Sequence, residues 1–168
     1  NDPIHAIEEF QFHLPGKDVI GRQTGMFDLR VNEDINVTLG CGLGGTSLIN
    51  ANVAVEPEPR VFNDPRWPKA LRDDVADGLQ KGYKRANAML QPTPYPNEVP
   101  LPKLAAQQKS AAQTGGKFTV PPIAVTFKDR NNAAGVFQNA CTLCGDCCSG
   151  CNVGAKNTLV MNYLPEAV

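Results

Sequence analysis

The sequence has almost no net charge and no long apolar run, and each absence argues against a class of protein. Its 16 lysines and arginines nearly balance its 17 aspartates and glutamates, which leaves a formal charge of −1. Nucleic-acid binding depends on a clustered excess of basic side chains, so we expect no nucleic-acid partner. No segment approaches the roughly 18 uninterrupted apolar residues of a membrane helix, so we expect no transmembrane segment.

Histidine is also scarce. His5 and His13 are the only two, both near the N-terminus, and no Ser/His/Asp arrangement, phosphate loop or carboxylate pair is recognisable. Because tuned histidines commonly perform acid–base catalysis, the sequence predicts no catalytic residue in this chain. The chain begins with Asn1 and carries no basic and apolar leader. We therefore expect it to be an internal piece of a longer protein.

Length and composition favour a globular α+β chain. The 168 residues suffice for one domain with a sizeable core, while 15 glycines and 14 prolines predict many turns. We divide the chain into three predicted segments. Residues 1–62 carry a hairpin and a glycine-rich turn, residues 63–128 are helical and proline-rich, and residues 129–168 hold a cysteine-rich loop and a final helix.

Local periodicity predicts the individual elements. Alternation predicts a strand over residues 10–14 and a hairpin formed by residues 26–31 and 35–39. Apolar residues at intervals of three and four predict a helix over residues 64–90, in which Asp64 and Pro65 resemble a cap and first turn. The remaining predictions are an extended segment at 91–102, a short helix at 103–116 stopped by Gly115 and Gly116, a strand at 117–128 and a truncated helix near the C-terminus.

A glycine-dense turn, GCGLGGTSLINANVAVEP, spans residues 40–57. Gly40, Gly42 and Gly45 match G-x-G-x-x-G after a predicted strand, a spacing that lets backbone amides approach a pyrophosphate. The residues that follow make a poor amphipathic helix, which argues against a standard dinucleotide-binding unit. The alternative is a turn that packs closely against another backbone.

Five of the six cysteines lie between positions 141 and 151. Cys141, Cys144, Cys147 and Cys151 have the C-x2-C-x2-C-x3-C spacing by which ferredoxins hold iron–sulfur clusters. Paired C-x2-C spacing also suits zinc, and a disulfide or structural thiol cluster is the third reading. The spacing alone leaves all three open.

The glycine turn resembles the flavin-contacting loop of the glucose-methanol-choline oxidoreductases, and in particular the branch that includes cholesterol oxidases. The similarity continues in YKRANAML at 83–90 and GAKNTLVMNYLPEA at 154–167. It implies a partial FAD-binding and substrate-cap segment of an alcohol or sterol oxidoreductase. The family's upstream Rossmann fingerprint and its C-terminal catalytic histidine are missing here, so the resemblance implies a fragment that is inactive alone and works with the remaining parts of the enzyme.

The resemblance also implies roles for individual residues. Backbone amides at the glycines and Thr46 would approach the flavin, Asn50 would hydrogen-bond near the isoalloxazine, and two apolar residues would pack along the ring edge. The implied FAD contacts are Gly42, Gly44, Gly45, Thr46, Asn50, Ala51 and Val53. Asn52, where relatives often have glycine, is either an added polar contact or a turn residue.

Three further residues follow the cysteines. We expect Lys156 to be a surface lysine near a helix start, rather than an anion ligand, and Asn157 and Thr158 to cap the final helix.

Our leading hypothesis is a fragment of an FAD-dependent oxidoreductase that oxidises CH–OH groups by hydride transfer to flavin N5, with FAD and an alcohol or sterol as partners. The alternative is an iron–sulfur electron-transfer or metal-binding module that uses the four spaced cysteines to hold a [4Fe-4S] cluster or another metal. A third hypothesis is a structural piece that pairs with a separate chain.

Overall fold

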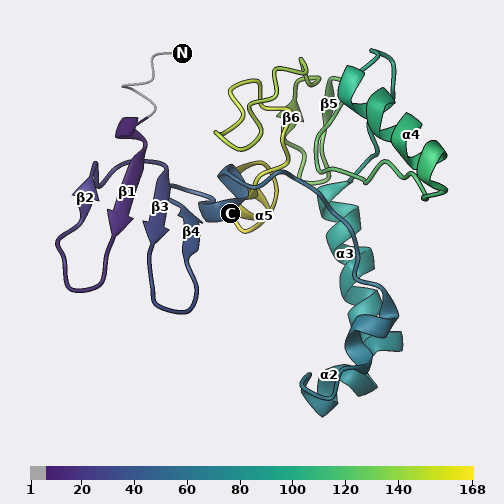
Figure 1. Ribbon diagram of the computed structural model, residues 1–168. Coiled ribbons are helices and arrows are strands. Elements are labelled where there is room, and N and C mark those ends of the chain that lie inside the picture. The colour runs from purple at the N-terminus through teal and green to yellow at the C-terminus, as the bar shows by residue number, and fades with distance from the viewer. Residues whose placement is uncertain (1–6) are drawn as a thin grey trace.

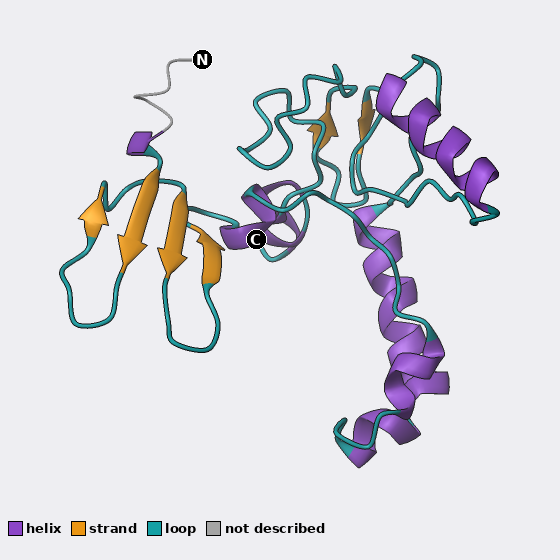
Figure 2. Cartoon of the chain, in the orientation of Figure 1, coloured by secondary structure: helices purple, strands orange, loops and turns teal. Residues whose placement is uncertain are grey.

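A computed structural model describes residues 7–168 and confirms the α+β class (Figures 1 and 2). A four-stranded sheet lies at one side of the molecule, and helices α2 and α3 project away from the rest of the chain (Figure 1). The polypeptide then returns through α4 and a small two-stranded sheet. The C-terminus ends between the first sheet and α3 in this view.

The sheet contains the strand and the hairpin that alternation predicted. Its order is β2-β1-β3-β4, with β1 at Phe10–His13, β2 at Ile20–Gly21, β3 at Phe27–Arg30 and β4 at Val37–Gly40. Strands β3 and β4 are antiparallel and form the predicted hairpin, whereas β1 and β3 run parallel with Phe10 opposite Phe27. The hairpin carries the chain directly into the glycine turn after Gly40.

In this sheet the polar face is more deeply buried than the aromatic face, which is the reverse of the usual arrangement. Phe10 stacks on Phe12 and on Phe27, with ring centroids 6.1 and 4.8 Å apart, yet all three rings are only partly buried. The opposite face is polar, and there Gln11 and Asp28 are buried. Among the described helices and strands, the strands of this sheet make their main contacts with one another and with the 3₁₀ turn that follows β4.

The helical region begins later than its periodicity indicates. Helix α2 spans Lys69–Asp73, a π-helical turn spans Val75–Leu79, and α3 spans Gln80–Leu90. The predicted start at Asp64 is wrong because Pro68 disfavours helical geometry at the residue before it. The Asp64 carboxylate instead accepts a hydrogen bond from the Arg66 amide at 2.9 Å.

Helix α4 spans Pro102–Thr114 and ends at Gly115, which has φ 69°, as predicted. The predicted strand at 117–128 is wrong. Pro121 and Pro122 lack amide hydrogens, so this segment forms isolated bridges rather than a ladder. Ile123 bridges to Val53 and Thr93, and residue 125 bridges to residue 156.

The last quarter of the chain contains little regular structure. A two-stranded sheet pairs β5 at Arg130–Asn131 with β6 at Phe137–Gln138. The predicted final helix is split into a 3₁₀ turn at Leu159–Met161 and the short helix α5 at Tyr163–Glu166. Asn162, with φ −130° and ψ −90°, breaks the helical geometry between them.

The sizeable core expected from the chain length is absent from the described residues. Their buried apolar side chains are Phe62, Ala124, Val125 and Ala155, whereas ten polar or charged residues are buried. The chain exposes 11784 Å², against about 8,100 Å² for a compact monomer of this mass. Polar contacts between loops therefore carry much of the tertiary structure.

Among residues 7–168, none of the helices combines the length and the apolar character that crossing a bilayer requires. The three-segment division remains a prediction.

Gly82 offers a test of the helical assignment. It lies within α3, and a Cβ added there would meet no atom within 4 Å. We expect Gly82→Ala to raise the free energy of unfolding by about 0.5–1 kcal/mol, because alanine loses less backbone entropy on entering a helix. Gly115→Ala, which forces alanine into φ 69° in equally open space, should lower it. Urea denaturation of both variants measures the difference, and destabilisation by Gly82→Ala would contradict the helix.

Candidate functional site

The glycine turn adopts backbone geometry that explains its composition. Gly42, Gly44 and Gly45 have φ values of 136°, 101° and 55°, and the first two lie well outside the ordinary left-handed region for residues with a side chain. At Gly40 the reason is steric, because a Cβ there would lie 2.5 Å from the Gly45 carbonyl oxygen. The turn thus folds back on the end of β4, and a 3₁₀ turn at Gly45–Leu48 follows.

This turn presents unpaired amide donors. Within the described part of the chain, the N–H groups of Gly42, Leu43 and Gly44 donate to no protein acceptor. A Cβ added at Gly45 would meet nothing within 4 Å, whereas one at Gly42 would lie 3.2 Å from Leu48 and one at Gly44 would lie 3.2 Å from Ser47 and Val160. Three successive free amides, of which those of Gly42 and Leu43 belong to exposed residues, form an arrangement that suits an anionic or electron-rich ligand.

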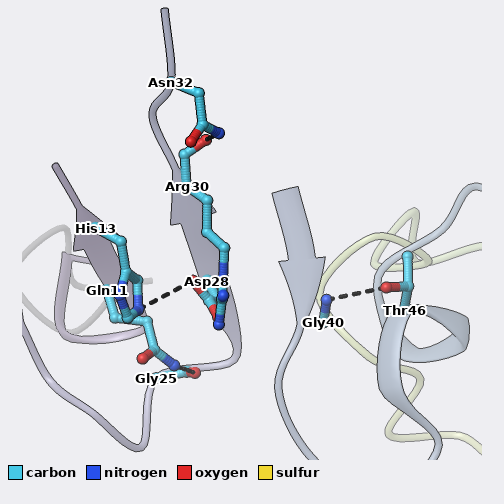
Figure 3. A network of polar contacts seen from close by, with 8 residues as sticks. All are labelled: Gln11, His13, Gly25, Asp28, Arg30, Asn32, Gly40 and Thr46. Carbon is cyan, nitrogen blue, oxygen red and sulfur yellow. Dashed lines mark hydrogen bonds and ion pairs between the residues drawn. The ribbon is translucent and has the colours of Figure 1, made fainter. Parts of the chain in front are cut away.

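Residues 46–53 continue the surface of the turn. The Thr46 hydroxyl accepts a hydrogen bond from the Gly40 amide at 3.2 Å, which ties the turn to β4 (Figure 3). Asn50, Ala51 and Val53 are exposed. The seven residues implied as FAD contacts therefore lie on one continuous segment, with the side chains of residues 46, 50, 51 and 53 exposed.

Asn52 differs from its neighbours because it is buried. It is 6% exposed, has φ 62°, and donates its backbone amide to the Asn50 side-chain oxygen at 3.2 Å. Its side-chain Nδ2 has no hydrogen-bond partner among the described residues. A buried donor without a partner is costly in a folded protein, so Asn52 is both a turn residue and a candidate donor to a ligand.

The turn is held from behind by Lys156. This residue is 1% exposed, so the expectation of a surface lysine is wrong. Its Nζ donates to the carbonyl oxygens of Leu48 and Asn50 at 2.9 Å and of Cys147 at 2.7 Å. Burial lowers the pKa of the Lys156 ammonium, while the nearby thiols of the cysteine loop act in the opposite direction.

Asn157 has a different role from the predicted cap of the final helix. Its Nδ2 donates to the carbonyls of Met89 and Leu90 at 3.0 and 2.9 Å, so it caps the C-terminus of α3. Asn162, 1% exposed, supports it through two 3.1 Å hydrogen bonds. Thr158 precedes the 3₁₀ turn without a capping side-chain hydrogen bond. The predicted capping roles are therefore wrong.

The cysteine loop contains free thiols. All six cysteines are unpaired, so the disulfide reading is not supported. Across residues 7–168, no three His, Cys, Asp or Glu side chains are grouped so as to hold a metal, and Cys141, Cys144, Cys147 and Cys151 form no such site. Burial, followed by the charges of Cys141 and Cys151, raises the pKa of the Cys147 thiol. The grouping of these side chains therefore does not support the iron–sulfur or zinc readings.

The described histidine belongs to the sheet. His13 Nε2 lies 3.2 Å from an Asp28 carboxylate oxygen, and the other oxygen of Asp28 lies 3.1 Å from Arg30 (Figure 3). These charged groups come from the polar face of β1 and β3, away from the glycine turn. His5 lies outside the described residues.

The sequence predicts the glycine turn but not the buried polar residues that support it. Lys156 is the only charged residue between Asp146 and Glu166, a signal that it is not an ordinary solvated lysine. Gln138, 1% exposed, donates to the carbonyls of Gly154 and Lys156 at 3.2 Å, and no local pattern marks it.

Comparison with known proteins gives a consistent set of relatives. No protein-family model matches the chain. It is 27% identical over 152 residues to the cholesterol oxidase of Acinetobacter baumannii, and the aligned region covers 83% of this chain and 27% of that protein. It is 28% identical over 144 residues to the cholesterol oxidase of Mycobacterium tuberculosis strain H37Rv, covering 78% and 25% respectively. The chain thus spans about a quarter of the relatives' length, and the resemblance to the cholesterol-oxidase-like branch is confirmed.

Gly40 provides a test of the close approach within the turn. We expect Gly40→Ala to lower the free energy of unfolding by about 1–3 kcal/mol, because the new methyl group would overlap the backbone of Gly45 and Thr46. Gly116→Ala is the control, since its Cβ would make only ordinary contacts and its φ is not in the left-handed region. Equal stability of the two variants in denaturant titrations would refute the packed turn.

The cysteines can be tested by their rates of alkylation. We expect exposed Cys144 and Cys148 to react with iodoacetamide faster than Cys147 at pH 8, because Cys147 is partly buried and its raised pKa reduces its thiolate fraction. Mass spectrometry of digests taken over time gives the order. Reaction of Cys147 first would contradict this environment, and thiols that resist alkylation in denaturant without reductant would reveal disulfides.

Proposed function

We propose that this chain supplies the flavin-contacting turn of an FAD-dependent oxidoreductase that acts on CH–OH groups of an alcohol or sterol. The observation that carries the proposal is the run of three unpaired amides at Gly42, Leu43 and Gly44 in a chain similar to cholesterol oxidases. The remaining parts of the natural protein would complete the cofactor site and provide the acid–base residue.

The glycine turn would bind FAD through its backbone. The unpaired amides of Gly42 and Gly44 carry no side chain, and Thr46 is exposed, so a pyrophosphate or ring edge can approach them. The Gly45 amide already donates to the Gly42 carbonyl at 2.9 Å, so Gly45 would offer the cofactor a contact surface. Such contacts need no positive side chain. This agrees with a segment, 35–59, that contains no lysine or arginine.

The second half of the turn would lie against the isoalloxazine. Asn50 and Ala51 expose polar backbone and side-chain groups, and the 56% exposed Val53 offers an apolar contact to a ring. The unpaired Nδ2 of Asn52 fits an acceptor atom on the cofactor, which would satisfy a donor that has no protein partner.

When bound, FAD would supply the redox chemistry by accepting a hydride from the substrate carbon at N5. This chain's residues would bind and orient the cofactor and limit water at its edge. We assign no catalytic residue here. The proposed substrate class is taken from the names of the relatives, and the iron–sulfur alternative rests on the cysteine spacing alone.

Flavin binding by the natural, full-length polypeptide tests the proposal. We expect the purified protein to show the paired visible absorption bands of oxidised flavin, or to acquire them with added FAD. Absence of both, in a folded protein, would overturn the proposed function. Iron and sulfide with a broad charge-transfer band would instead support the electron-transfer alternative.

Asn52→Gly refines this test because glycine accepts φ 62° without strain and removes the side-chain donor. We expect FAD to bind about three- to tenfold more weakly, the effect of one lost neutral hydrogen bond. Asn97→Gly is the matched control, because Asn97 also has a left-handed φ, 59°, but lies in an exposed loop elsewhere. Equal FAD affinity in both variants would remove Asn52 from the site.

A further inference from the structure

Lys156 occupies an unusual position for a charged side chain. It is almost fully buried, and within the described chain no carboxylate lies within ion-pair distance of its Nζ. Its three partners are backbone carbonyls, two of which belong to the glycine turn. Hydrogen bonds from a charged donor are stronger than neutral ones, so this ammonium constrains the orientation of the peptides that it contacts.

The three carbonyls depend on Lys156 to different degrees. Leu48 also accepts a hydrogen bond from the Gly150 amide at 3.2 Å, so its carbonyl keeps a partner if the lysine is removed. Among the described residues, the Asn50 carbonyl accepts from Lys156 alone. The Asn50–Ala51 peptide is therefore the part of the turn whose orientation this side chain most directly controls.

Peptide geometry links that carbonyl to the open side of the turn. In a planar trans peptide, the C=O of one residue and the N–H of the next point in opposite directions. Because the Asn50 carbonyl points at the buried ammonium, the Ala51 N–H points away from it. Ala51 is exposed, and its N–H donates to no acceptor within residues 7–168.

We infer that Lys156 is a positioning residue that aims the Ala51 N–H at the cofactor, where it donates to an acceptor atom on the flavin ring. This inference rests on the proposed function and extends it to a residue 106 positions from the Asn50 carbonyl that it holds. Lys156 itself touches no cofactor. The Lys156 ammonium acts by fixing the orientation of one peptide plane. Without this side chain, the Asn50–Ala51 peptide is free to rotate.

Hydrogen exchange in the unaltered full-length protein is the first test. Bound FAD should slow exchange of the Ala51 amide at least tenfold, measured by mass spectrometry with overlapping fragments or by NMR. If FAD binds and the Ala51 amide exchanges as fast as before, the inference is overturned while the proposed function stands. If FAD does not bind the folded protein, both fail.

Substitution provides the second test. Lys156→Met keeps the length and apolar stem of the side chain and removes its donors. We expect FAD to bind at least tenfold more weakly, the visible flavin band to shift, and Lys156→Arg to restore part of both. The control is Asn162→Ala, an equally buried polar residue whose side chain contacts Asn157 and the Tyr163 amide rather than the turn.

Comparing Lys156→Met with Asn162→Ala separates a positioning role of Lys156 from a general loss of stability. At matched losses of unfolding free energy, Asn162→Ala should leave the flavin band in place and change FAD affinity less than threefold. Equal effects of Lys156→Met and Asn162→Ala on the band and on affinity would overturn the inference. If Lys156→Met does not fold, the exchange rate of the Ala51 amide in the unaltered protein decides the question.

Discussion

The contact of the Lys156 ammonium with three backbone carbonyls is the interaction on which the arrangement of this chain depends. It joins the glycine turn, at Leu48 and Asn50, to the cysteine loop, at Cys147. Desolvating an ammonium is costly, and strong hydrogen bonds must offset that cost. The same segment extends this role, because Asn157 binds the end of α3 and the Ala155 carbonyl accepts from the Thr126 amide.

A polar junction of this kind differs from an apolar core in what it specifies. Hydrophobic contacts tolerate small shifts, whereas a carbonyl that accepts a hydrogen bond has a defined direction. Residues 154–162 therefore fix how each loop is oriented as well as where it lies. A turn that uses backbone groups to contact a ligand needs that directional control, because its donors cannot adjust by changing rotamer.

Local patterns predicted the local structure well. Alternation found β1 and the hairpin β3–β4, and Gly115 marked the end of α4, because period and turn chemistry involve neighbouring residues. The strand predicted at 117–128 was wrong because two prolines remove ladder donors. The glycine turn was found from composition. Its support was not, since the carbonyl partners of Lys156 at Leu48 and Asn50 lie 108 and 106 residues away.

The partly exposed aromatic face of the β1–β3 sheet and the small apolar core have a thermodynamic consequence. Heat capacity changes on unfolding in proportion to the apolar surface that becomes exposed, and denaturant sensitivity scales with the total surface exposed. A chain that already exposes 11784 Å² has less left to expose than a compact chain of its size. Its stability should vary little with temperature over a wide range, and its unfolding transitions in heat and urea should be broad.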